Sequence, residues 1–517
     1  MNKHLFCVGA TWGHEDRIAG ASTSTNVPPP PKYGLRKDHK LVTPGQEQYG
    51  PPLRPVCGAT DAPNSRFSHF LSRVINDYAD CVEGSRECRS SEEMRASFEN
   101  FNGYSKEIRS KCRILSMDVK ALYPSMRWAD IVLAVKEMIE LSDMEVENVD
   151  WREAGKYIAV MVPPEEIERE GLSLVIPKRK KRRTRNITVN YLRTKNNDEK
   201  WTVSRKPGVR QKRKMIALII SVGVRLVMSN HTYKVGDEYY LQSEGGAIGL
   251  ELTGAVSRPF MMRWDKLYLK RVKSAGIKMR MYDRYVDDSN QAAEVLPPGS
   301  KYDKIRNKLE FDQDELLVRG EEGEEARLAR IMREIANEVQ EGIVMEEDYP
   351  DKNPNKKLAI LDMCVWMNSE HFLVYQHYEK SVASKLVIGA QSAQSEACKR
   401  SVHTRELIRR MLNTSAKLVW KDFSAPVLTE YMARMMQAGY SQNYRKRILE
   451  QAMRIYDKIV NDDSQGKIPI NRPKDWNKQE RRKGKRRKKY DWSNKGGYIA
   501  PLMVPSTPNS VLMKIMM

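Results

Sequence analysis

The chain has 517 residues, of which 40% are hydrophobic, and its 89 lysines and arginines outnumber 67 aspartates and glutamates to give a formal net charge of +22. This length allows two to four domains of about 100 to 200 residues with sizeable cores. The positive surplus favours a polyanionic partner, most commonly nucleic acid, over neutral or acidic partners. A basic soluble protein without such a partner is the alternative at this stage.

Cysteine usage and apolar segments exclude two further classes. The seven cysteines are scattered and odd in number, which indicates reduced thiols and not a disulfide framework or a zinc site. The longest apolar run, residues 215–228, contains Arg225 and is too short to span a bilayer. The amino terminus has no secretory pattern, so we expect a soluble protein without a membrane partner. The basic runs 178–185 and 481–489 would serve as nuclear-import signals, or they contact phosphates or are simply solvated.

The first 80 residues are predicted to contain a tether, short extended pieces and one helix. Residues 1–32 read as a disordered tether because they end in a proline run, which favours extended polyproline geometry. Residues 67–78 have the apolar spacing of a helix with one buried face. Arg54 precedes Pro55, so its backbone is expected to be extended. Its planar guanidinium could bind phosphates, or it could pair with a surface carboxylate.

A first candidate carboxylate, Asp118, ends a short apolar strand. Tyr123 and Pro124 stop this strand, and Trp128–Leu141 has the spacing of a helix with one buried side. After this helix, about residues 143–212 read as an insertion, part loop and part hairpin, with a basic block. The block is available to follow a nucleic-acid backbone, although a solvated linker explains it equally well.

A glycine-rich turn lies between two predicted helices, over residues 215–228 and 253–270. Gln242 leads into Gly245 and Gly249 at this strand-to-helix turn. Glycines let the backbone approach a duplex or an incoming base closely. The start of the following helix offers free amides to phosphate.

Two adjacent carboxylates, Asp287 and Asp288, are predicted to lie at the tip of a tight β-hairpin. Adjacent strand residues point to opposite faces, so only a tip or a kinked turn directs both at one ion. Most such pairs are solvated turn residues, but here Asp118 adds a third carboxylate. Together they would form an oxygen-rich site for hard divalent cations. Two such ions about 4 Å apart activate an attacking hydroxyl and stabilise a departing pyrophosphate, which is polymerase chemistry.

The remaining chain is predicted to alternate between helices and strands before it loses periodicity. Residues 326–339 form an amphipathic helix pattern and residues 343–345 a strand pattern, which favours a split βαβ arrangement around the carboxylates. Residues 361–375 read as a hairpin and residues 395–460 as basic amphipathic helices. Residues 466–517 are predicted to be a basic tail, disordered until it meets nucleic acid.

This ordered set of motifs resembles the reverse transcriptases, and within them the Penelope-like retroelements. The matching segments are residues 33–40, 53–56, 118–125, 240–249, 284–288, 357–362 and 374–380. The resemblance implies an α/β fold of the α+β palm type, in a right-hand polymerase. It places the fingers at 33–112, a split βαβ palm at 113–362, and a primer grip and helical thumb at 363–465. The paired Gly-Ile-Tyr and Tyr-Ile-Gly motifs of the endonuclease that some of these elements carry do not occur in the sequence.

The resemblance implies an RNA-directed DNA polymerase that extends a primer 3′-hydroxyl with deoxynucleotides by a two-metal mechanism. Asp118, Asp287 and Asp288 would hold two Mg²⁺ ions, with Mn²⁺ as a substitute. Lys357 would protonate the departing pyrophosphate, although a solvated turn lysine needs no such role. The nucleotide-binding residues would be Arg54, Tyr123, Gln242, Gly245 and Gly249. Tyr123 would exclude the ribose 2′-hydroxyl, and the partners would be an RNA template, a DNA primer and dNTPs.

Two alternatives stay open. An RNA-dependent RNA polymerase shares the palm and the paired aspartates, although Val286 and Tyr123 favour deoxynucleotides. A catalytically inactive nucleic-acid-binding protein derived from a retroelement would keep the basic surface without needing the three aspartates.

Overall fold

A computed structural model describes most of the chain. The described residues are 30–36, 53–59, 64–142, 158, 162–170, 172–175, 191–195, 201–203, 209–319, 321–380 and 385–464. They form a mixed fold of helices and strands, which confirms the predicted α/β class. The predicted tail 466–517, most of the predicted tether 1–32, and the basic runs 178–185 and 481–489 lie outside the described residues.

The chain divides into two compact units, each made of segments that are distant in sequence. The first unit comprises Met1–Arg89, Met117–Ser289 and Leu296–Glu347, and the second comprises Ser90–Ser116, Asn290–Val295 and Asp348–Met517. The predicted boundaries of fingers, palm and thumb do not coincide with these units and stay a prediction.

A four-stranded sheet in the order β13-β3-β10-β9 carries the predicted aspartates. Its strands are β3 (Cys112–Val119), β9 (Met279–Tyr285), β10 (Asp288–Glu294) and β13 (Met345–Asp348). Helices separate β3 from β9 and β10 from β13, so the elements follow the βαββαβ pattern of a split βαβ fold. β9 and β10 form the predicted hairpin.

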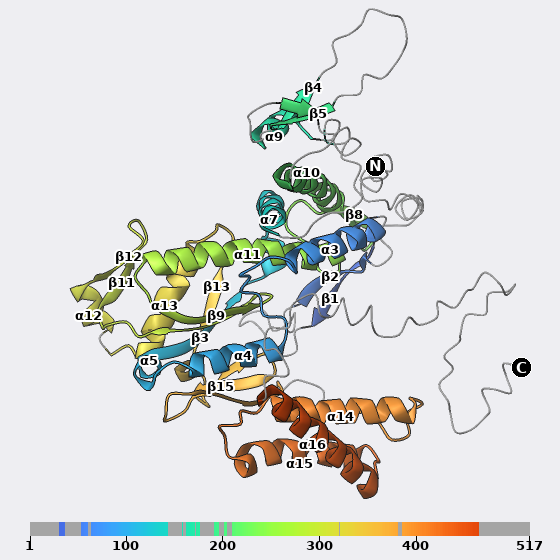
Figure 1. The fold of residues 1–517 in the computed structure, drawn as a ribbon, viewed down its shortest axis with the longest axis vertical. Coiled ribbons are helices and arrows are strands. Elements are labelled where there is room, and N and C mark those ends of the chain that lie inside the picture. The colour runs from blue at the N-terminus through green and yellow to red at the C-terminus, as the bar shows by residue number, and fades with distance from the viewer. Residues whose placement is uncertain are drawn as a thin grey trace, which may run out of the picture. The chain divides into compact units, whose positions relative to one another are not determined.

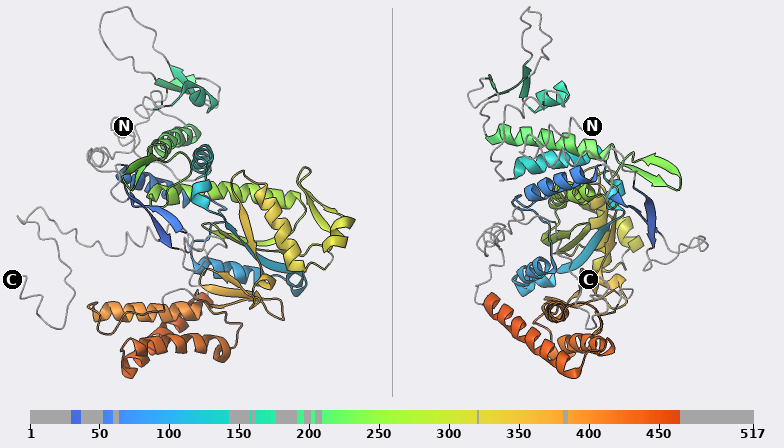
Figure 2. Two further views of the ribbon diagram at one scale, coloured as in Figure 1. Left: turned by 180° about the vertical axis from the view of Figure 1, so that it is seen from behind. Right: turned by 90° about the vertical axis from the view of Figure 1, so that its right-hand side faces the viewer.

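Four helices of the first unit pack on one another because each presents one apolar face. They are α3 (Ser65–Ala79), α7 (Trp128–Leu141), α10 (Val209–Met228) and α11 (Glu251–Ser274), and they confirm the helices predicted over 67–78, 128–141, 215–228 and 253–270. Figure 2 shows α10, α7 and α3 side by side. α10 begins inside the stretch 143–212 that we predicted to be an insertion. None of the helices that the structure describes combines the length and the apolar character needed to cross a bilayer.

Aromatic stacking joins α11 to the sheet. The Trp264 ring stacks on Tyr268 at 4.8 Å between centroids, and Tyr268 lies 5.7 Å from Tyr282 of β9. All three side chains are buried. Figure 1 shows α11 running beside β9, together with α13 (Glu324–Asn337), the helix predicted over 326–339.

Short antiparallel pairs complete the first unit. The pairs are β1 (Lys32–Arg36) with β2 (Leu53–Cys57), β7 (Thr232–Val235) with β8 (Glu238–Leu241), and β11 (Ser300–Asp303) with β12 (Lys308–Phe311). A separate three-stranded antiparallel sheet contains β4 (Leu172–Val175), β5 (Tyr191–Lys195) and β6 (Trp201–Val203). The short helices α6 (Leu122–Ser125) and α9 (Pro164–Arg169) lie between β2 and β4 in sequence, and α12 (Gln313–Arg319) follows β12. The stretch 143–212, part of which we predicted to be a hairpin, is described only in part. The extension of β11, β12 and α12 was not predicted.

The second unit combines a three-stranded antiparallel sheet with a helical bundle. Its strands are β14 (Leu358–Ile360), β15 (Met363–Met367) and β16 (Leu373–His377), and its helices are α4 (Ser91–Asn102), α5 (Lys106–Ser110), α14 (Glu396–Leu412), α15 (Trp420–Gln437) and α16 (Gln442–Ser464). The hairpin predicted over 361–375 and the helical pattern predicted over 395–460 are both confirmed. A one-turn helix, η3 (Pro350–Lys352), precedes β14.

One buried side chain ties α4 to the edge of this sheet. The Asn102 carboxamide accepts a hydrogen bond from the Leu373 N–H at 2.8 Å and donates one to the Leu373 carbonyl at 3.0 Å. Asn102 is 7% exposed, so water does not replace these bonds when the side chain is lost.

We therefore expect Asn102→Ala to lower the free energy of unfolding of the second unit by about 2 to 3 kcal/mol, since two backbone groups lose their partners. Urea denaturation followed by circular dichroism measures this. The exposed Asn100→Ala on the same helix is the control and should change stability by less than about 0.5 kcal/mol. Equal midpoints for the two variants would contradict the role of Asn102.

Candidate active site

The structure brings the three predicted aspartates together. Asp118 lies near the end of β3, Asp287 lies in the hairpin tip, and Asp288 begins β10. One oxygen from each carboxylate lies within 4.8 Å of the other two. Behind them, the Ser289 hydroxyl donates to the Met117 carbonyl at 3.3 Å and links β10 to β3. Three half-buried or exposed carboxylates at this spacing form the donor set that hard divalent cations prefer, with positions left for water and phosphate oxygens.

A kink in the backbone aims the two consecutive aspartates at one place. Val286 has φ of 56°, in the left-handed region that side chains with a branched Cβ rarely adopt. The kink breaks the alternation of an extended strand, so Asp287 and Asp288 do not point to opposite faces. The sequence predicted that a kinked turn was required, but it did not show what holds the kink.

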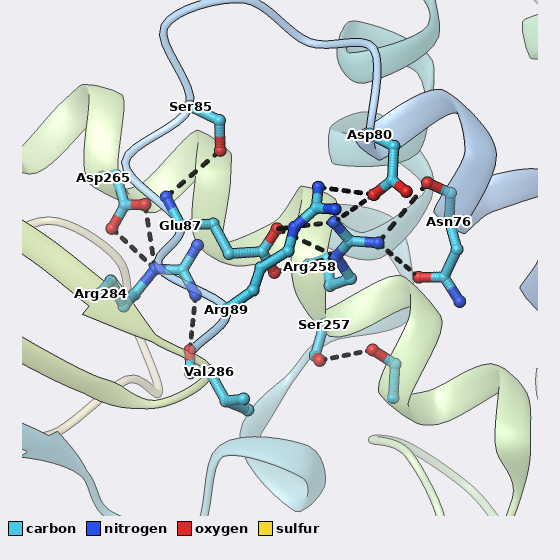
Figure 3. Close-up of polar contacts among 11 residues, drawn as sticks. Asn76, Asp80, Ser85, Glu87, Arg89, Ser257, Arg258, Asp265, Arg284 and Val286 are labelled. Atoms are coloured by element: carbon cyan, nitrogen blue, oxygen red, sulfur yellow. Dashed lines mark hydrogen bonds and ion pairs between the residues drawn. The ribbon is translucent and has the colours of Figure 1, made fainter. Parts of the chain in front are cut away.

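The residues beneath the turn were missed by sequence reasoning. The buried Arg284 places Nε 2.9 Å from both oxygens of Asp265 on α11, and its Nη1 donates to the Val286 carbonyl at 2.6 Å (Figure 3). The Tyr282 hydroxyl donates to Asp265 at 2.6 Å. Burial raises the pKa of the Asp265 carboxyl, and the neighbouring Arg284 and Tyr282 oppose this rise. The sequence did contain a signal for a buried charged residue, because Asp265 interrupts the apolar face of a predicted helix between Trp264 and Tyr268.

A second group of charges continues this network toward α3. The Arg258 guanidinium of α11 bonds to Glu87 at 2.7 Å, to Asp80 at 2.9 Å and to the Asn76 side chain at 2.8 Å (Figure 3). Arg89 lies 2.5 Å from Asp80 and 3.7 Å from Glu87. Opposite charges therefore connect α3, the segment 85–89 and α11.

Tyr123 lies in the electrostatic surroundings of Asp287 and Arg54. Tyr123 is half-buried in α6, near Ser257 of α11, whose hydroxyl donates to the Gly254 carbonyl at 2.8 Å. Burial and the charge of Asp287 raise the pKa of the Tyr123 hydroxyl, while Ser257 and Arg54 act in the opposite direction. Arg54 itself is exposed on β2. Tyr123, the residue predicted to contact the sugar, thus lies within electrostatic reach of both Asp287 and Arg54.

The predicted glycines make close contacts with the protein backbone. A Cβ atom at Gly245, where φ is 71°, would lie 2.4 Å from the Pro124 carbonyl oxygen, and one at Gly249, where φ is 105°, would lie 2.0 Å from the Cys57 carbonyl oxygen. The Cys57 N–H donates to the Ile248 carbonyl at 2.8 Å. We expected close approach to nucleic acid, but the contacts that require these glycines join the turn to α6 and β2.

Gln242 and Lys357 have local partners. The Gln242 carboxamide donates to the Glu244 carbonyl at 2.7 Å. Lys357 belongs to the second unit, where its ammonium lies 3.8 Å from the centre of the Trp366 ring. This cation–π contact is a local reason for the lysine to be ordered, so its predicted role as a general acid stays a prediction.

A further group with metal-ligand side chains lies in the second unit, where His377, Glu379 and Glu406 have donor atoms within 4.8 Å. Arginines occupy both carboxylates: Arg409 and Arg410 bind Glu406, and Arg410 and Arg434 bind Glu379. A bound cation would have to displace or face these guanidinium groups. The group is therefore an ion-pair network around a buried histidine and a poor cation site.

No protein-family model matches the chain, and no functionally curated protein matches it. Similar solved structures include telomerase from Candida albicans in complex with a fragment of telomeric RNA, at 10% identity and a TM-score of 0.34, over 84% of this chain and 66% of that chain. BmCPV RNA-dependent RNA polymerase at elongation state matches at 8% identity and a TM-score of 0.38, over 82% of this chain and 28% of that chain. Apo telomerase from Candida tropicalis matches at 9% identity and a TM-score of 0.34, over 86% of this chain and 59% of that chain. The chain thus spans less than two thirds of the length of each of these proteins.

The environment of His377 predicts an acid-sensitive second unit. Burial and the charges of Arg410 and Arg409 lower the pKa of His377 to about 4, and Glu406 and Glu379 oppose this only in part. Below pH 6.5 the unfolded chain binds a proton that the folded chain does not, so stability falls as the pH falls toward 4.

We expect His377→Gln to remove this dependence. Between pH 7 and pH 4.5 the wild-type chain should lose about 2 kcal/mol more unfolding free energy than the variant. Urea denaturation at both pH values measures the difference. Parallel losses in the two proteins would contradict a buried neutral histidine.

Proposed function

We propose that the chain is a right-hand nucleic-acid polymerase, and specifically an RNA-directed DNA polymerase. The observation that carries the proposal is the convergence of Asp118, Asp287 and Asp288 at one end of a sheet with the βαββαβ pattern. A nucleic-acid-binding protein without activity has no need for three carboxylates that repel one another at this distance. The net charge of +22 supports a nucleic-acid partner.

The three aspartates would hold two Mg²⁺ ions, or Mn²⁺ as a substitute. When bound, such ions supply charge neutralisation of the triphosphate and activation of the primer 3′-hydroxyl. Their ligands fit hard cations, since every donor is a carboxylate oxygen. The protein itself then contributes mainly position, because phosphoryl transfer requires aligned groups and little covalent chemistry.

The neighbouring residues would select and hold the nucleotide. Arg54 would bind the triphosphate through its planar guanidinium. The Tyr123 ring would pack under the sugar and exclude a 2′-hydroxyl, and Gly245 and Gly249 would keep Tyr123 and β2 at fixed separation. Lys357 would protonate pyrophosphate.

The substrates would be an RNA template, a DNA primer and dNTPs. The order of the motifs supports an origin in a Penelope-like retroelement, and the basic runs 178–185 and 481–489 support a nuclear location. These finer assignments rest on the sequence motifs.

Primer extension tests the function. With an RNA template, a DNA primer and Mg²⁺, we expect extension with dNTPs, and we expect Asp287→Ala/Asp288→Ala to lower the rate by about a thousandfold or more, since several kcal/mol of charge stabilisation are lost. The control Glu165→Ala/Glu168→Ala removes two exposed carboxylates from α9 of the same unit and should leave the rate unchanged. Binding without extension in either Mg²⁺ or Mn²⁺ would contradict the proposal, and extension with rNTPs alone would replace it by an RNA polymerase.

Sugar selection tests the role of Tyr123. Tyr123→Ala should reduce the preference for dNTPs over rNTPs by about tenfold or more, because the ring that collides with the 2′-hydroxyl is gone. Tyr123→Phe keeps the ring and removes only the hydroxyl, so it should retain the preference. Steady-state kcat/KM for matched dNTP and rNTP pairs measures both. An unchanged ratio in Tyr123→Ala would exclude this role.

A further inference from the structure

The aspartate turn adopts a conformation that its own sequence disfavours. A left-handed backbone at Val286 is unfavourable because its branched side chain crowds the neighbouring carbonyl. The Val286 side chain is 38% exposed, so packing around it does not supply the missing stabilisation. Some other contact must hold the turn.

The Arg284 guanidinium supplies that contact. Its Nη1 donates to the Val286 carbonyl at 2.6 Å, and its Nε faces both Asp265 oxygens at 2.9 Å. Arg284 is 1% exposed and Asp265 is 3% exposed, so water does not compete for these bonds. A planar guanidinium can serve a carboxylate and a carbonyl at the same time with fixed geometry, which a lysine ammonium does not reproduce.

Both ends of Arg284 are anchored to the same helix. Its side chain reaches α11 through Asp265, which also accepts a bond from Tyr282. Its main chain accepts a bond from the Cys88 N–H at 2.7 Å and donates to the Arg86 carbonyl at 2.9 Å. The intervening Glu87 side chain bonds to Arg258 of α11 (Figure 3). Two sets of contacts therefore fix the turn relative to α11: one through Asp265, and one through the segment 86–88 and Arg258.

We propose that Arg284 and Asp265 are positioning residues of the three-aspartate cation site. They contact no cation themselves, and they act by holding Val286 in the left-handed conformation that turns Asp287 and Asp288 toward Asp118. The inference rests on the proposed function only in that the three aspartates bind a divalent cation. Loss of the Arg284 bond to the Val286 carbonyl should weaken cation binding by about tenfold, as loss of groups that orient metal ligands commonly does.

The test is direct binding of Mn²⁺ alone, measured by water-proton relaxation and by electron paramagnetic resonance of free Mn²⁺. The proteins are the full chain, Arg284→Lys, and Arg284→Lys combined with Val286→Gly. Arg284→Lys keeps a positive charge beside Asp265, but a lysine ammonium cannot bond to the Asp265 carboxylate and the Val286 carbonyl with the geometry of the guanidinium. Arg330→Lys is the matched control, because Arg330 is 9% exposed and binds Glu322 through two nitrogens on α13, in the same unit. The Asp287→Ala/Asp288→Ala variant gives the Mn²⁺-binding signal of a chain that lacks the cation site.

We expect Arg284→Lys to raise the Kd for Mn²⁺ about tenfold, with Arg330→Lys within twofold of wild type. Adding Val286→Gly should recover part of the loss, since glycine adopts the left-handed conformation without steric cost. A buried pair that served stability alone would not respond to a glycine at the exposed tip. If Arg284→Lys does not fold, Asp265→Asn, which keeps the size of the side chain, replaces it with the same expectations.

Three results would overturn the inference: wild-type affinity in a folded Arg284→Lys, equal losses in Arg284→Lys and Arg330→Lys, or no recovery with Val286→Gly. Absence of Mn²⁺ binding in the wild-type chain would instead overturn the cation site of the proposed function. Normal Mn²⁺ binding without primer extension would leave the positioning role intact and remove only the polymerase assignment.

Discussion

Three carboxylates that repel one another have to be held within 4.8 Å, and the rest of the first unit is arranged to meet this requirement. Two of them come from consecutive residues, which an extended strand would direct to opposite faces. The left-handed backbone at Val286 directs both carboxylates to one place, although this conformation is unfavourable for valine. The bond from the buried Arg284 to the Val286 carbonyl offsets that unfavourable energy. Burying an arginine charge is itself unfavourable, and the Asp265 carboxylate compensates for it. The Tyr282 hydroxyl in turn donates to Asp265.

A second constraint operates through backbone contacts at the glycine turn. Gly245 and Gly249 each sit where any side chain would collide with a carbonyl oxygen, one in α6 and one at the end of β2. The turn consequently fixes the separation between the segment that contains Tyr123 and the strand that contains Arg54. Residues predicted to contact different parts of a nucleotide are therefore connected by main chain, which is stiffer than a chain of side-chain contacts.

Local patterns in the sequence were sufficient for much of this structure. Apolar spacing located α3, α7, α10, α11 and α13, and the paired aspartates between apolar stretches located the β9–β10 hairpin. The partners that stabilise the hairpin were not predictable in this way, since Glu87 and Arg258 are 171 positions apart and neither belongs to a recognisable motif. The glycine turn was located correctly. Its contacts with Pro124 and Cys57 depend on how distant segments are placed in space, which the apolar periodicity of the sequence does not reveal. The extension at residues 300–319 carries no strong apolar pattern, because much of its surface is exposed.

The order of the segments in the two units has a consequence for how the chain is made. The strand that bears Asp118 is bordered by β13, and the Lys120 N–H bonds to the Val344 carbonyl at 2.8 Å. A ribosome has therefore delivered all three aspartates long before it delivers the strand that closes their sheet. Until about residue 348 emerges, β3 exposes an unpaired edge next to its acidic residue. Contacts between such distant residues form slowly, so this edge of the growing chain needs protection from other strands.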